Sequence, residues 1–225
     1  MVNDFAGRSN LKVLGTSSSL GGFFQDVKIT GECRFNGDVD CQSLSITGEN
    51  EVSGSLKTEK LKLTGELAVN GRLEAGTLRG QGDIKAGSLC AEQLKLSGSL
   101  EVSGNCEAEE LELSGTLQVK GLLSAEKIQL KLYGPGSAAE VGGGTITVKR
   151  SKTKALLLPG NHTEMRFTAG LIEGDYIELQ NTHADTVRGE KVIIGTGCVI
   201  QKVEYSSLLE IHKSALVKQQ LKITK

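Results

Sequence analysis

The chain has 225 residues, of which 29 are glycine and only 2 are proline, and aromatic residues make up 4% of it. This composition argues against a core built on large rings and favours a repetitive structure rich in small residues. Lysine and arginine (26) nearly balance aspartate and glutamate (27), so charge gives no reason to expect nucleic acid as a partner. The five cysteines form no CxxC pair, and no apolar run reaches signal-peptide or membrane-span length, so we expect a cytoplasmic protein.

Residues 1–26 contain the tract GTSSSLGG and only short apolar pieces, a pattern typical of a flexible arm. Three apolar side chains, Phe5, Leu11 and Leu14, stand close to two basic residues and could contact a membrane peripherally. A disordered tail explains the same residues more simply.

Residues 27–131 carry an internal repeat, apolar-x-apolar-x-Gly, that returns at a nearly constant interval of about 17 residues. Its copies are VKITG, LSITG, LKLTG, LRGQG, LKLSG and LELSG, which start at Val27, Leu44, Leu61, Leu78, Leu94 and Leu111. A second glycine follows each first one, and one short interval between the two glycines accounts for the single shorter step, from Leu78 to Leu94. A fixed interval of this kind indicates one structural unit per repeat.

Within each repeat, apolar and polar residues alternate with period two, which predicts extended chain with one buried face. The two glycines of a repeat mark two corners, and polar pairs such as Glu59 and Lys60 mark a third. We therefore predict an all-β fold, a parallel and triangular β-solenoid with windings of about 17 residues. A β-sandwich of short strands also alternates, but its strands do not repeat at a fixed interval.

The glycine-paired repeats, together with GTSSSLGGFF from Gly15 and ITGECRFNGDVDCQSLSITG from Ile29, resemble the bactofilin family over residues 27–131. The resemblance implies a right-handed triangular β-helix that polymerises without nucleotide into a cytoskeletal scaffold, often at the inner face of the cell membrane. It implies the chain itself, or a paralogous bactofilin-like chain, as the partner. Cell shape, motility and envelope organisation are the processes that such scaffolds serve.

Residues 132–225 are predicted to continue the solenoid less regularly or to cap it, because their glycine rhythm is irregular. A basic loop is expected at 149–166, and its apolar residues Leu156, Leu157 and Leu158 either contact a partner or lipid or pack back on the solenoid. The end of the chain could form a final strand pair or a short helix.

The activity that this fold suggests is assembly, because a terminal winding leaves backbone groups unpaired. We expect the polymerisation interface at Phe23, Phe24, Val27 and Ile29 at one end, and at Ile193 and Val199 at the other. The alternative is a non-polymerising adaptor whose C-terminal region closes the solenoid.

No motif predicts catalysis, a cofactor, a metal site or a small-molecule substrate, since Walker and dinucleotide-binding patterns are missing. Hexapeptide acyltransferases share coiled β architecture and need a general-base histidine, for which His183 is the candidate to test. Three cysteines, Cys33, Cys41 and Cys106, fall at inward positions and are expected to fill the core, whereas Cys90 falls at an outward position.

Overall fold

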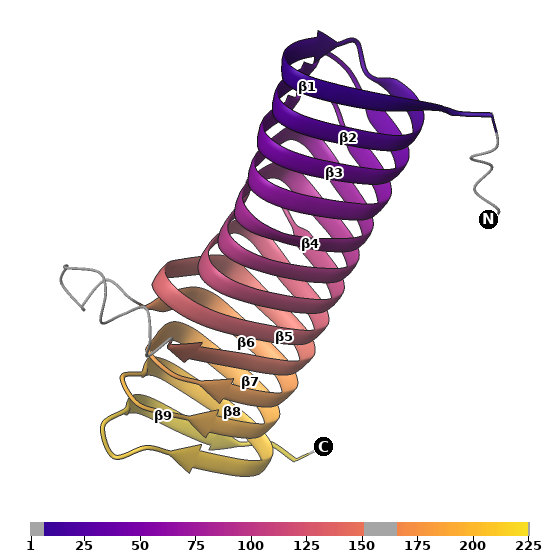
Figure 1. Cartoon of the computed structure of the whole chain (residues 1–225). Coiled ribbons are helices and arrows are strands. Elements are labelled where there is room, and N and C mark those ends of the chain that lie inside the picture. Colours follow the sequence, from indigo (N-terminus) through magenta and orange to yellow (C-terminus); the bar gives the residue numbers. More distant parts are fainter. Residues whose placement is uncertain (1–6, 151–165, 225) are drawn as a thin grey trace.

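The computed structural model describes residues 7–150 and 166–224 and consists of one continuous parallel β-solenoid (Figure 1). Its single sheet has the strand order β1-β2-β3-β4-β5-β6-β7-β8-β9, and every pairing between successive strands is parallel. The chain makes about 12 turns with windings of about 17 residues, so the predicted fold class is confirmed. The strands are β1 Ser9–Ser19, β2 Gly22–Phe35, β3 Val39–Val52, β4 Leu56–Val102, β5 Cys106–Arg150, β6 Phe167–Leu179, β7 Thr182–Ile194, β8 Val199–Ile211 and β9 Leu216–Lys222.

The core is a set of vertical stacks of apolar side chains. Leu44 lies in register with Leu61, and Ile46 lies in register with Leu63, while all four side chains are at most 3% exposed. Cys33, Cys41 and Cys106 lie in this core as predicted. Because each winding repeats the inward pattern of the one before it, hydrophobic burial is shared evenly along the rod.

One column of glycines turns successive windings of the N-terminal half at the same corner. Gly31, Gly48 and Gly65 are in register and have φ values of 120°, 126° and 126°. A Cβ placed on Gly48 would lie 2.1 Å from the carbonyl oxygen of Gly31, so a side chain fits neither the backbone conformation nor the spacing between windings. The predicted use of glycine as a corner residue is confirmed here.

The first winding corrects the predicted flexible arm at 1–26. Residues 9–19 form β1, which pairs with β2 and places Leu11 over Val27 and Gly15 over Gly31. The tract after Gly15 is polar even where Ser17 and Ser19 stand in register with buried Cys33 and Phe35, so its composition resembles that of a linker.

The C-terminal region extends the solenoid through its last described strand. Gly136 pairs with Phe167, Phe167 with Thr182, and His183 with Val199, so windings of changing length keep the parallel register. Most of the predicted basic loop, including Leu156, Leu157 and Leu158, lies outside the described residues. The alternative of a terminal helix is wrong, because Leu216–Lys222 forms β9 on β8.

Candidate functional site

The N-terminal end of the described rod is the edge of β1. Val27 and Ile29, predicted at an exposed end, are each 1% exposed because Leu11 and Val13 of β1 lie over them. Neither can therefore be a terminal contact. Leu11 is only partly buried against the core, as expected for a side chain with a winding on one side of it.

The C-terminal end is formed by the last stretch of β8 and by β9. The predicted residues Ile193 and Val199 face outward from earlier windings, because Ile193 pairs with Glu210 and Val199 with Leu216. The core stacks end instead on four partly buried residues that pack against the core: Leu209, Ile211, Ala215 and Val217. Both ends thus present incompletely covered apolar stacks beside the edge of a strand.

Two predicted phenylalanines differ in their surroundings. Phe24 packs against the core, whereas Phe23 is 69% exposed with the guanidinium of Arg8 5.3 Å from its ring centre. Arg8 also donates to Asp40, with 2.6 Å between its Nη1 atom and the carboxylate Oδ1. These contacts fasten the start of the first winding to the side of the rod.

The proposed membrane contacts are only partly visible. Leu11 faces the core and Leu14 is 70% exposed, whereas Phe5 lies outside the described residues. The described residues also contain no helix with the length and apolar character needed to cross a membrane.

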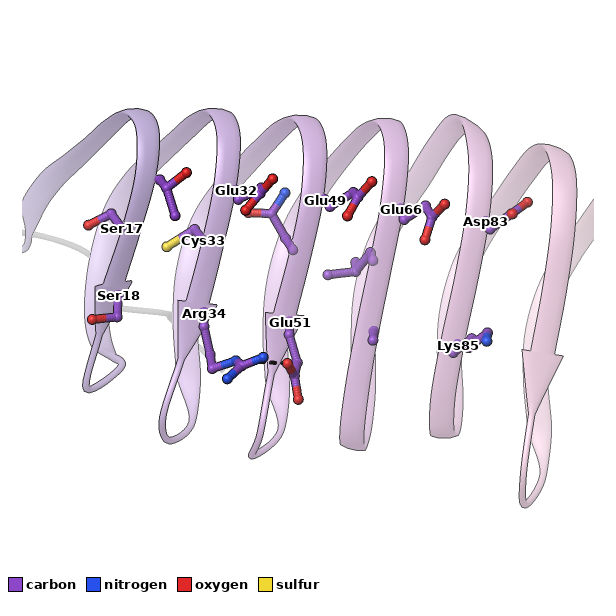
Figure 2. Close-up of a pocket in the computed structure, with 14 residues that line it drawn as sticks. Ser17, Ser18, Glu32, Cys33, Arg34, Glu49, Glu51, Glu66, Asp83 and Lys85 are labelled. Carbon is purple, nitrogen blue, oxygen red and sulfur yellow. Dashed lines mark hydrogen bonds and ion pairs between the residues drawn. The ribbon is translucent and has the colours of Figure 1, made fainter.

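The side wall carries charged rows that run along the rod. Glu32 pairs with Glu49 and Glu49 with Glu66, so these carboxylates stand one above another, and Asp83 continues the row (Figure 2). A neighbouring row contains an ion pair between windings, with 2.9 Å between Arg34 Nε and Glu51 Oε2. Aligning the repeats in the sequence would have revealed the acidic row, because its members recur once per repeat.

The acyltransferase candidate His183 lies on the outer wall beside Arg166, with 3.4 Å between Nδ1 and Nη1. Partial burial and the positive charge of Arg166 lower the pKa of His183. A shallow pocket beside it is lined by small residues such as Ala169, Gly170 and Ala184. The described residues contain no group of three or more histidine, cysteine or acidic side chains suited to a metal ion.

The described residues define a parallel β-solenoid whose first and last described strands carry partly buried apolar residues of the core stacks. No protein-family model and no solved structure matches it. The chain is 40% identical over 84 residues to the uncharacterized protein YhbF of Bacillus subtilis strain 168. The aligned segment covers 37% of this chain and 34% of that protein. It is 57% identical over 56 residues to the uncharacterized protein YhbE of the same strain. This aligned segment covers 25% of this chain and 24% of that protein. The chain thus spans about a third and a quarter of the lengths of these curated relatives.

Proposed function

We propose that this protein is a bactofilin-like cytoskeletal scaffold, not an enzyme, whose rods join through their ends without nucleotide. The observation that carries the proposal is the chemistry of the terminal windings. Leu11 at one end and Val217 at the other are core positions that pack against the core on one side only. A further winding supplied by another molecule would cover these apolar groups and continue the backbone hydrogen bonds.

The same terminal geometry accepts either the chain itself or a related chain, because the backbone ladder is independent of side-chain identity. Matching apolar stacks would then select partners whose windings have the same length and inward pattern. We place such polymers in the cytoplasm, with the inner face of the cell membrane as a candidate location. Support of cell shape, motility or envelope organisation is the role we assign to them.

A second candidate, the non-polymerising adaptor, is favoured by one feature of β9. Gln220 occupies the position in register with buried Val203, and Lys218 and Lys222 flank it on the same strand. Polar and charged residues on a terminal strand discourage edge-to-edge pairing. If β9 closes the rod, only the β1 end remains available, and two molecules would form a discrete pair.

Variants at each end test the proposal. Val13→Asp places a charge in the terminal stack of β1, and Val217→Asp does so in β9, with Ser18→Asp and Gln219→Asp as outward-facing controls on the same strands. Electron microscopy and sedimentation should show long polymers for the unmodified chain and both controls, and shorter species for each end variant.

Separate outcomes distinguish the two candidates. Loss of polymers in both end variants supports a scaffold that uses both ends. Discrete pairs of the unmodified chain that only Val13→Asp dissolves support the adaptor with a closed β9 end. Single particles of the unmodified chain at micromolar concentration contradict end-to-end assembly, provided that circular dichroism shows the β-structure to be intact.

A further inference from the structure

A basic row and an acidic row run in parallel on adjoining walls of the N-terminal half of the rod. Lys12 pairs with Lys28, which stands in register with Ser45, and Ser45 in turn with Lys62. Arg79 follows Lys62 one repeat later. All four cationic side chains are exposed. We name the set Lys12, Lys28, Lys62 and Arg79 the basic row.

The acidic row, Glu32, Glu49, Glu66 and Asp83, begins directly after the corner formed by the glycine column. Lys28 and Glu32 stand on either side of Gly31 in one winding, and Lys62 and Glu66 stand on either side of Gly65 in another. Figure 2 shows the four carboxylates aligned on successive windings. The two rows are therefore separated by a fixed corner, and both follow the spacing of the windings, about 4.8 Å.

These rows differ from the other charged columns of the described wall in their lack of ion pairs. Arg34 pairs with Glu51 and Lys57 with Glu74 between neighbouring windings, and the column of the basic row itself passes, beyond Arg79, into an ion pair between Lys95 and Glu112. Within residues 7–150 and 166–224, no salt bridge involves Lys12, Lys28, Lys62 or any of the three glutamates of the acidic row. Like charges placed directly opposite each other on neighbouring strands repel. Charges of opposite sign from another molecule would relieve this repulsion.

We infer that two copies of this chain pair side by side through these rows, the basic row of each facing the acidic row of the other. A twofold axis parallel to the rod brings the corner of one molecule against the corner of its partner, and it exchanges the two rows. Lys28, Lys62 and Arg79 then face Glu32, Glu66 and Asp83 of the other copy at the same height, whereas Lys12 faces Thr16. A second copy is the matching occupant because it carries both charges in the correct order and at the same spacing.

The corner itself permits close approach. In the three windings of Gly31, Gly48 and Gly65, the exposed side chains between the two rows are small threonines, Thr30, Thr47 and Thr64. Across these three windings no bulky side chain stands between the charged rows, whereas exposed Leu14 and Gln81 hold the same position in the windings on either side. The opposite orientation, with antiparallel rods, would place lysine against lysine and carboxylate against carboxylate. The pairing is therefore expected to be parallel.

This lateral pairing goes beyond end-to-end assembly. It is measured separately, because side-by-side pairing changes the width of the particles and end-to-end assembly changes their length. One variant reverses the basic row (Lys28→Glu with Lys62→Glu), one reverses the acidic row (Glu32→Lys with Glu66→Lys), and one carries all four changes. A control reverses two exposed charges on another wall (Glu107→Lys with Glu109→Lys). Electron microscopy at low salt gives the width of the particles, whether they are single rods or polymers.

The unmodified chain, the control and the four-change variant should form paired rods, and each single-row variant should form single rods. Recovery of pairing in the four-change variant is the decisive result, because it restores complementarity with every charge inverted. Equal widths in all chains, or no recovery in the four-change variant, would overturn the inference.

Two further measurements protect the test. If a single-row variant loses its β-structure, a salt titration of the unmodified chain takes the place of that variant. Paired rods should separate at high salt, because salt screens the attraction between the two rows. Pairs that persist at high salt contradict the inference. Vesicles of phosphatidylserine test the competing occupant of the basic row. The unmodified chain would then bind these vesicles, the basic-row variant would not bind them, and every chain would form single rods. That result would assign the basic row to lipid and refute pairing.

Discussion

Replacing Gly65 by alanine adds one methyl group at the corner where successive windings approach most closely. Gly65 has φ of 126°, and its new Cβ would lie 2.2 Å from the carbonyl oxygen of Gly48. That oxygen would have to retreat to about 3.4 Å for ordinary contact, which disrupts the ladder between the two windings. Backbone strain of about 1–3 kcal/mol and one or two weakened hydrogen bonds at about 1 kcal/mol each give a destabilisation of about 2–5 kcal/mol.

The matched control is Gly142→Ala, because a Cβ at Gly142 meets no atom within 4 Å and Gly142 has no positive φ. Alanine there should leave stability unchanged or raise it by about 0.5–1 kcal/mol through the unfolded state. Unfolding in guanidinium chloride, followed by circular dichroism, gives the two midpoints relative to the unmodified chain. Equal midpoints for Gly65→Ala and Gly142→Ala would refute the steric account of the glycine column.

Three further predictions concern the interior and the ion pairs. Asn50 is 6% exposed and neither its Nδ2 nor its Oδ1 has a partner, so Asn50→Leu should raise the free energy of unfolding by about 1–3 kcal/mol; an unchanged or lower midpoint would contradict this. Burial raises the pKa of the Cys106 thiol to about 12, so at mildly alkaline pH iodoacetamide should label Cys90 first, and mass spectrometry that finds equal labelling would exclude this order. Lys202 and Arg188 lower the pKa of Glu204, so its contribution to stability is full above the usual value of 4.5 and is lost as the pH falls through the lower folded value. Glu204→Gln should flatten that acid-dependent loss, and an unchanged pH profile would contradict the assignment.

The repeat made the core predictable because inward residues and corner glycines are fixed by the local alternation of the chain. Leu61, Leu63 and Gly65 can be assigned from one winding and transferred to the next by moving along the chain by one repeat. The first winding was missed although LKVLG at Leu11 precedes VKITG at Val27 by nearly the same interval as the later repeats. Its second half is a run of serines, which fills inward and outward positions alike and therefore hides the alternation, and serine is as common in linkers as in such a strand.

The ends were harder to predict because they depend on which winding is last. Ile193 and Val199 resemble core residues in the sequence, yet windings of unequal length in this region shift the alternation and turn both outward. A row of charges on the surface is made of residues from neighbouring windings, so it can be recognised only once the register between the windings is known. The sequence contains that information for the acidic row, where Glu32, Glu49, Glu66 and Asp83 recur at equal intervals.

Electrostatics separates the two kinds of assembly. The last described windings are basic: Lys213, Lys218 and Lys222 lie beyond His212 with no acidic residue among residues 212–224, and Lys12 lies on β1. End contacts therefore bring like charges together, while apolar burial supplies the attraction. The Debye length falls from about 10 Å at about 0.1 M salt to about 3 Å at about 1 M, so added salt weakens this repulsion and should lengthen polymers. The same salt weakens the attraction between the basic and acidic rows of paired rods, so added salt should reduce the width of the assemblies. Length and width measured in one salt series should consequently change in opposite directions, and a parallel decrease of both would show that charge, not the apolar stacks, holds the ends together.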